Sequence, residues 1–221
     1  MTEQSISDYL NQLQSENGLP GGGSATAIVG AMSAALVHMV SEIQKDKKSL
    51  KDSRQEVMTI LKEAEEVKEH FEKLKDQDAI AFEPVSKAYK LPKDTEEQKS
   101  SRQKAIEKGL HSAVQPPLSM MKTTLKLIEL YDRLARLPIK GSIVNDIAVG
   151  ILFARTTLQS SHLNVLVNTN FMKDEQTKKE LEGLGNTYLV QGEEKADQIY
   201  ADSKYYLMHK KWPSMDVRGV Q

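Results

Sequence analysis

The sequence predicts an all-α fold, a single-domain bundle of long helices. Three observations carry this prediction. Long stretches run without strong helix breakers, no convincing period-two alternation or hairpin turn pair lies between them, and one stretch keeps a seven-residue apolar repeat. The few breaks lie at residues 18–23, 91–92, 116–117, 137–141 and 168–174. Because no linker-like shift in composition divides the 221 residues, we expect one domain over 1–221, with 210–221 as a candidate loose tail.

The first element expected is a short helix capped by Ser5 or Ser7, with Ile6, Leu10 and Leu13 facing inward. A later helix has a clear start at Thr95, since Glu96 and Glu97 place carboxylates where the helix dipole favours them. The predicted longer helices cover residues 25–40, 57–88, 95–114, 118–136, 143–167 and 175–209.

The helix over 57–88 carries two apolar series, each spaced by seven and offset by three, which is the pattern of a helix packed in a bundle. The ten positions are Val57, Ile60, Ala64, Val67, Phe71, Leu74, Asp78, Ala81, Val85 and Ala88. Nine of them are apolar and the tenth is Asp78. A carboxylate on a buried seam must be paired, protonated or open to a pocket. Asp78 is therefore a candidate for acid–base chemistry, and the alternative is a structural Asp bonded to a lysine or a helix end.

Three glycines, Gly21, Gly22 and Gly23, precede Ser24, which we expect to cap the helix that begins at Ala25. Amides at a helix start favour an anion or a polarised oxygen. The stretch is neither a Walker loop nor a dinucleotide fingerprint, because the Gly-Lys-Ser/Thr ending and a preceding strand are both missing. Taken alone, a glycine-rich turn is more often a turn than a binding site.

Composition excludes several function classes. The net charge of −1 offers no basic surface for nucleic acid, and the absence of cysteine excludes disulfides, thiol catalysis and Cys-ligated zinc. The five histidines are scattered without ligand spacing, so we expect no metal site. The most apolar window, 25–40, is shorter than a membrane span, and the N-terminus does not read as a signal peptide. We therefore expect a soluble, cytoplasmic protein.

Four stretches in order resemble the formiminotetrahydrofolate cyclodeaminase and methenyltetrahydrofolate cyclohydrolase family. They are PGGGSATAIVGAMSAALVHMV (20–40), DAIAFEPVSKAYKLPKDTEEQKSSRQKAI (78–106), NDIAVGILFA (145–154) and NVLVN (164–168). The resemblance implies an all-helical domain that forms a homodimer, takes folate as substrate and needs no cofactor beyond tetrahydrofolate. It places the family's catalytic carboxylate on Asp78, the residue that interrupts the apolar seam.

The resemblance also suggests substrate-binding residues, each with a plainer alternative. The amides of Gly21, Gly22, Gly23 and Ser24 are expected to face the folate cleft near a subunit boundary, the alternative being a simple turn. Asp146 belongs to a matching stretch, although a first-turn carboxylate is also what a helix dipole favours. Asn164 and Asn168 share a helix face and suit either a pterin edge or the helix ends of the bundle. Lys47, Lys48 and Arg102 are candidates for the folate carboxylates, or are solvated surface residues. The segment around the two lysines departs from the family pattern, because Asp46 stands where many relatives have glycine.

Three functions follow from these observations. The first is closure of 5-formiminotetrahydrofolate to 5,10-methenyltetrahydrofolate with release of ammonia, with Asp78 as general acid and base. The second is methenyltetrahydrofolate cyclohydrolase activity, which needs the same groups with water as nucleophile. The third is a non-catalytic helical oligomerisation module, in which Asp78 acts as a buried polar specificity device.

Overall fold

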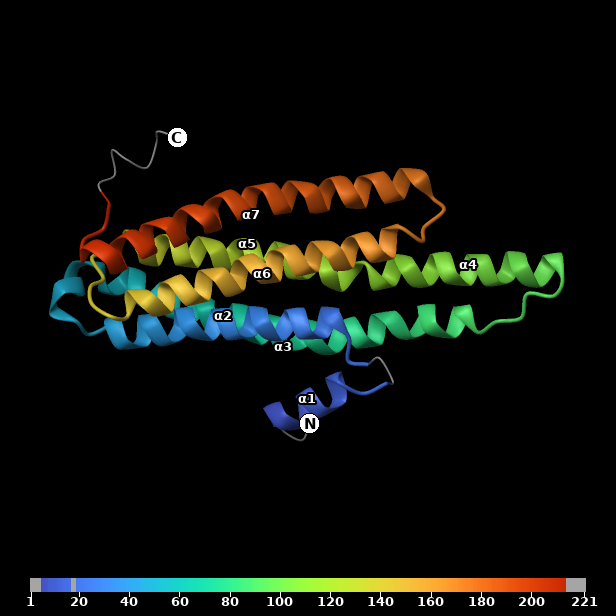
Figure 1. The fold of residues 1–221 in the computed structure, drawn as a ribbon, viewed down its shortest axis with the longest axis horizontal. Helices are drawn as coiled ribbons and strands as arrows, with labels where there is room; N and C mark the ends of the chain where they lie inside the picture. Colours follow the sequence, from blue (N-terminus) through green and yellow to red (C-terminus); the bar gives the residue numbers. More distant parts are fainter. Residues whose placement is uncertain (1–4, 17–18, 214–221) are drawn as a thin grey trace.

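The computed structural model describes residues 5–16 and 19–213. Over these residues the chain forms seven α-helices and one short 3-10 helix, and no strand (Figure 1). They are α1 (Ile6–Leu13), α2 (Gly22–Gln44), η1 (Lys48–Ser53), α3 (Arg54–Tyr89), α4 (Glu96–Ala113), α5 (Gln115–Arg136), α6 (Val144–Thr169) and α7 (Glu175–His209). The all-α prediction is confirmed, and the predicted long helices lie close to the observed ones.

The long helices lie side by side in an elongated bundle (Figure 1). Within it α2 packs on both α3 and α6, while α5 packs on α3, α6 and α7. The outer parts of α3 and α4 form a hairpin that projects past the other helices, and α1 lies beside the first turn of α2. The first turn of α2 is therefore positioned near the middle of α3.

The apolar seam predicted for α3 from the seven-residue repeat is mostly buried. Eight of its ten positions are buried, and the two others, Asp78 and Ala81, are partly exposed. The helix continues through Pro84, whose missing N–H leaves the carbonyl of Ile80 without its helical donor. Because the Ile80 side chain is 67% exposed, water can reach this turn.

The small residues of α2 let other helices approach its backbone. A Cβ at Gly30 would lie 2.6 Å from the Phe71 ring of α3. Ser33 Oγ donates a 2.7 Å hydrogen bond to the carbonyl of Gly150 on α6, and the Tyr131 hydroxyl of α5 donates one of 2.7 Å to the Ser33 carbonyl. The glycines and small residues thus bring α2, α3, α5 and α6 into close contact inside one chain.

By length and composition, α2 is the one described helix that is apolar enough to cross a membrane, with a mean hydropathy of 1.5 over its best window. Half of that window is buried inside the bundle. A central helix of a helical bundle has the same composition, because it too is covered on several sides by apolar neighbours.

The structure corrects the predicted orientation of the first helix. Ser5 does cap α1, accepting a hydrogen bond from the Asp8 amide, but Ile6 and Leu10 are 79% and 53% exposed. The buried side chain is Tyr9 instead. Amphipathic spacing shows which residues share a helix face, whereas the position of the core relative to that face depends on tertiary packing.

At the other end of the chain, α7 ends at His209, as predicted, and Lys210 adopts a left-handed conformation. Trp212 then donates a 2.8 Å hydrogen bond to the Ile139 carbonyl and packs on Tyr206. The first residues of the candidate tail are therefore held against the bundle, and the remainder, 214–221, lies outside the described residues.

Candidate active site

The Asp78 carboxyl group lies against the first turn of α2. A Cβ built on Gly23 would stand 2.3 Å from Oδ1 and 2.4 Å from Oδ2 of Asp78, so a side chain at this position would displace the carboxyl group. The backbone N–H of Ser24 donates a hydrogen bond to the same carboxyl group. The glycine-rich turn and the carboxylate that interrupts the seam, 55 residues apart in the sequence, therefore meet at one place.

Two opposing effects set the pKa of Asp78. Partial burial raises the pKa, because the charged form loses hydration, and the Ser24 N–H lowers it by a smaller amount. The net shift is upward from the ordinary value of 3.8. A carboxyl group with a raised pKa can accept a proton and return it at a pH closer to neutral.

Ser24 takes a different role from the predicted helix cap. The helix begins at Gly22 and its N-cap is Gly21, so Ser24 lies inside the first turn. Its Oγ accepts a 3.2 Å hydrogen bond from the Tyr9 hydroxyl, and both side chains are buried. Tyr9 thus holds α1 against the α2 terminus, a contact that sequence reasoning missed because it oriented α1 by its aliphatic residues.

Asn164 and Asn168 use their amide N–H groups inside the bundle. Asn164 Nδ2 donates to the Ser160 carbonyl at 2.8 Å, while Asn168 Nδ2 donates to the carbonyls of Asn164 at 2.8 Å and Ala113 at 3.3 Å. Two of these bonds are to carbonyls one turn earlier within α6, and only the one to Ala113 reaches a helix end, that of α4. Helices α2 and α6 touch at Ser33 and Gly150 and run antiparallel. The carboxyl end of α6 therefore lies at the amino end of α2, where Gly23 is (Figure 1).

The remaining predicted residues lie away from Asp78 within one chain. Lys47 and Lys48 are exposed just beyond the far end of α2, and a helix of its 23 residues is about 35 Å long. Asp146, in the first turn of α6, is close enough to Tyr131 to affect its pKa, and Tyr131 bonds to Ser33, about 15 Å along α2 from Gly23.

Arg102 binds the end of α3. Its guanidinium donates a 3.2 Å hydrogen bond to the Tyr89 carbonyl and lies 5.5 Å from the centroid of the Tyr89 ring. Basic side chains commonly satisfy the last carbonyls of a helix in this way. Tyr89 is about 16 Å from Asp78 along α3, so this interaction holds the α3–α4 hairpin together rather than reaching the carboxyl group.

Phe82 is an additional candidate at the site. It lies one turn after Asp78 on the same side of α3 and is 44% exposed. An exposed ring on the same helix face as a carboxyl group suits a flat heterocycle. Within the described residues, no group of three His, Asp or Glu side chains is arranged to hold a metal ion.

Comparison with known proteins identifies the family. Residues 5–184 match the model of the formiminotransferase-cyclodeaminase family. The chain belongs to this family. It is 35% identical to a methenyltetrahydrofolate cyclohydrolase of Methylorubrum extorquens over 82% of this chain and 88% of that protein. It is 30% identical to the formimidoyltransferase-cyclodeaminase of Sus scrofa over 78% of this chain, and the match spans 32% of that longer protein.

A solved structure extends the likeness to the fold. The formiminotetrahydrofolate cyclodeaminase of Thermotoga maritima superposes with a TM-score of 0.78 at 25% sequence identity, covering 95% of this chain and 98% of that one. These named family members are folate-processing enzymes. The resemblance inferred from four short motifs is therefore confirmed at the level of family and fold.

Proposed function

We propose that this chain is a folate one-carbon enzyme in which Asp78 acts as general acid and base. The observation that carries the proposal is the contact of the Asp78 carboxyl group with Gly23 and the Ser24 amide. This contact places a carboxyl group of raised pKa at the partly exposed end of the α2–α3 interface. The family relationship supplies the substrate class.

The first candidate reaction is cyclodeamination. N10 of 5-formiminotetrahydrofolate attacks the carbon of the protonated formimino group and forms a new C–N bond, while Asp78 takes the N10 proton. The protonated carboxyl group then gives a proton to the formimino nitrogen, and cleavage of its bond to carbon releases ammonia and leaves 5,10-methenyltetrahydrofolate. Both proton transfers suit one carboxyl group of raised pKa. No electrons are exchanged, so this sequence requires no redox cofactor.

The second candidate is the cyclohydrolase reaction, and one specific observation favours it. The 35% identical relative that matches this chain along most of both sequences carries that name. Here water attacks the methenyl carbon, Asp78 accepts a proton from it, and return of a proton to N5 allows the C–N5 bond to break. The remaining hydroxyl proton is lost to solvent as the formyl C=O forms. The product is 10-formyltetrahydrofolate.

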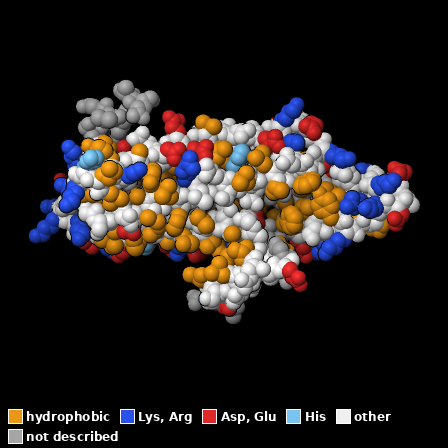
Figure 2. Space-filling model, viewed as in Figure 1, with side chains coloured by type: hydrophobic (Ala, Val, Ile, Leu, Met, Phe, Trp, Pro, Cys, Tyr) orange, Lys and Arg blue, Asp and Glu red, His pale blue; other side chains and the backbone are white. Residues whose placement is uncertain are grey.

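We further propose that the enzyme is a homodimer formed through the outer face of α2 and α6. On this face Met32, Met39 and Ile43 of α2 and Leu152 of α6 are 50%, 37%, 47% and 41% exposed. Hydrophobic side chains gather over these two helices in Figure 2. An exposed apolar surface of this kind is typical of an interface.

In this proposed dimer a two-fold axis passes through the middle of α2, and this affects the candidate active site. It would place the far end of one α2 beside the first turn of the other, because an isologous interface pairs each end with its opposite. Lys47, Lys48 and Asp146 would then approach the Asp78 site of the partner subunit. This arrangement supports a binding role for residues that lie far from Asp78 in their own chain.

The direct test is a parallel spectrophotometric assay of the purified protein with 5-formiminotetrahydrofolate and 5,10-methenyltetrahydrofolate. Formation of the methenyl compound with ammonia release identifies the cyclodeaminase. Loss of the methenyl compound faster than its spontaneous hydrolysis identifies the cyclohydrolase. Absence of both activities together with absence of folate binding would overturn the proposal in favour of the helical module.

A further inference from the structure

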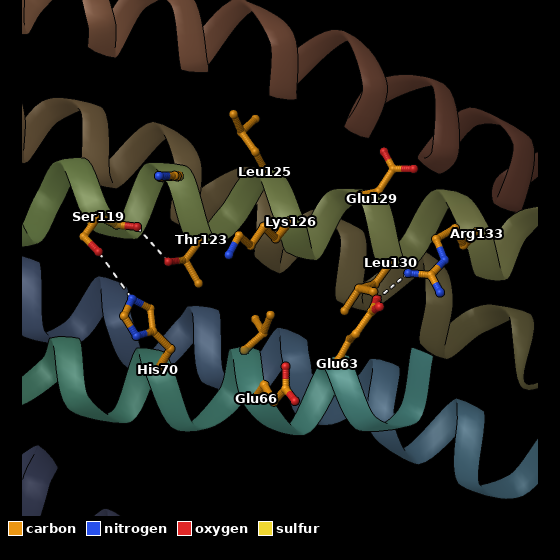
Figure 3. Close-up of a pocket in the computed structure, with 12 residues that line it drawn as sticks. Glu63, Glu66, His70, Ser119, Thr123, Leu125, Lys126, Glu129, Leu130 and Arg133 are labelled. Carbon is orange, nitrogen blue, oxygen red and sulfur yellow. Dashed lines mark hydrogen bonds and ion pairs between the residues drawn. The ribbon is translucent and has the colours of Figure 1, made fainter. Parts of the chain in front are cut away.

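A hollow lies between α3 and α5, on a different side of α3 from the α2 contact. It has a volume of about 880 Å³ and is lined by side chains of both helices (Figure 3). We call it the α3–α5 groove. Its charged side chains divide into two ends with different pairing.

At one end of the groove the carboxylates are all ion-paired. Arg133 pairs with Glu63 across the groove and, at 2.6 Å, with Glu56. Glu129 pairs with Lys195 of α7. Each carboxylate at this end has a cationic partner, but the carboxylates outnumber the cations because Arg133 serves two of them, so the end offers no free cationic group to an anion.

The other end, formed by His70, Ser119, Lys122 and Lys126, is different, and we call it the basic end. Lys122 and Lys126 are exposed, and neither forms an ion pair or hydrogen bond with any residue that the structure describes. Ser119, Lys122 and Lys126 follow one another at helical spacing on the same side of α5. The remaining carboxylate on the groove, Glu66, lies 3.7 Å from the Lys62 ammonium.

His70 faces this basic end from α3. Its Nε2 lies 3.3 Å from Ser119 Oγ, and Figure 3 shows both groups and Lys126 directed toward the space between α3 and α5. Partial burial lowers the pKa of His70, and the positive charges of Lys126 and Lys73 lower it further. The His70 imidazole therefore binds a proton less readily than a free imidazole and lies in a positive field.

We propose that the basic end of the α3–α5 groove binds a small oxyanion with the size and charge of a phosphate group. Two ammonium groups and one further donor of the His70–Ser119 pair, either the hydroxyl or an imidazole N–H, face the anion from two helices. Charge-assisted hydrogen bonds of this type are the stronger ones in proteins. The ligand is either free phosphate or the phosphate ester of a small metabolite, and the site is separate from Asp78.

Binding has a specific electrostatic signature. The anion offsets the field of Lys126 and Lys73 and accepts a hydrogen bond from the ring, and both effects favour the charged imidazolium. The pKa of His70 therefore rises when the site is occupied. The other histidines (His38, His111, His162 and His209) lie outside the groove and serve as internal references.

The test is an NMR titration of the histidine ring resonances with inorganic phosphate at constant ionic strength, with His70 assigned from His70→Gln. A saturable shift of the His70 signals and an upward shift of its pKa are expected. Lys126→Gln and Lys122→Gln should each weaken binding about tenfold, because each removes one charge-assisted bond. Lys104→Gln, at an exposed position on α4, is the matched control and should bind as the wild type does.

Sulfate, acetate and chloride at the same ionic strength distinguish the chemistry. Sulfate should compete with phosphate, whereas acetate and chloride should not. If a phosphate ester such as glycerol phosphate binds more tightly than phosphate, the ligand is an ester, and if it binds less tightly, the ligand is the free ion. Absence of a saturable His70 shift, an equal response to chloride, or unchanged binding in both lysine variants would overturn the proposal.

Discussion

The carboxyl group of Asp78 lies so close to Gly23 that its position depends on the absence of a side chain there. The same contact buries the carboxyl group and raises its pKa, while the Ser24 amide gives it one hydrogen bond. Position, partial desolvation and hydrogen bonding of the proposed acid–base group thus all depend on one turn of α2.

Gly23→Ala should separate activity from folding. The new Cβ would push the carboxyl group out of place, and we expect turnover to fall about a hundredfold, as for other displacements of about 1 Å. The free energy of unfolding should fall by about 1–3 kcal/mol from overpacking. The control is Gly183→Ala, since nothing lies within 4 Å of that Cβ on α7. Wild-type turnover in Gly23→Ala would contradict the geometry.

Asp78→Asn should change how stability depends on pH. Because the native pKa of Asp78 is raised, the folded state holds this proton more tightly than the unfolded state, whose pKa is near 3.8. Ionisation therefore lowers the wild-type free energy of unfolding as pH rises from about 4 through the native pKa. Asp78→Asn has no carboxyl group to ionise here. Its free energy of unfolding relative to the wild type should therefore increase from about pH 4 to the native pKa of Asp78 and stay constant above it. Denaturant titrations at pH 4 and pH 7 measure it, and a constant difference would refute the pKa shift.

The sequence indicated Asp78 from its place on an apolar seam, and the family resemblance put the Gly21–Ser24 amides at the same cleft, but neither showed that Gly23 itself touches the carboxyl group. A seven-residue repeat identifies the buried face of one helix and leaves open which turn of another helix lies opposite. Tyr9 was missed for a related reason, since its hydroxyl finds its partner only after α1 folds back on α2.

At the scale of helices, glycine contacts bring α2, α5 and α6 together. A Cβ at Gly150 would lie 1.8 Å from the Tyr131 hydroxyl oxygen, which itself bonds to the Ser33 carbonyl. Helix boundaries followed well from the sequence, because prolines, glycines and caps are local signals. The close helix–helix contacts did not follow from the sequence. A glycine in a helix indicates that another group packs against the backbone there, but it does not identify that group.

Gly150→Ala should therefore cost about 3 kcal/mol in the free energy of unfolding, since Tyr131 is fully buried and has little room to move. Tyr131→Phe alone should cost about 1 kcal/mol through its lost hydrogen bond. In the double variant the clash is partly relieved, so the combined cost should be less than the sum. Additive values in thermal or denaturant unfolding would show that the two residues do not interact as described.

For the whole molecule, the exposed apolar face over α2 and α6 predicts self-association. Met32→Asp places a charge in the middle of this face and should shift the protein toward monomer, as measured by sedimentation velocity. Val190→Asp is the control, because Val190 is 65% exposed on α7, outside the proposed interface. A wild-type protein that sediments as a monomer at micromolar concentration would exclude this dimer.

Loss of the dimer should also lower turnover if residues of the partner subunit complete the site. Met32→Asp should then be less active than Val190→Asp at concentrations where only the former is monomeric. The overall bundle was predictable from helix-period patterns. Which ends of α2 would meet in the proposed dimer was not, because this depends on symmetry that a single sequence does not encode.

The central claim is tested most directly by comparing single-turnover rates and folate binding of the wild type and Asp78→Asn with the active substrate. The account predicts that the variant folds and binds tetrahydrofolate with near wild-type affinity, while its rate falls by a factor of about 10² to 10⁴. A variant that binds folate and turns over at the wild-type rate would show that Asp78 carries no proton in the reaction.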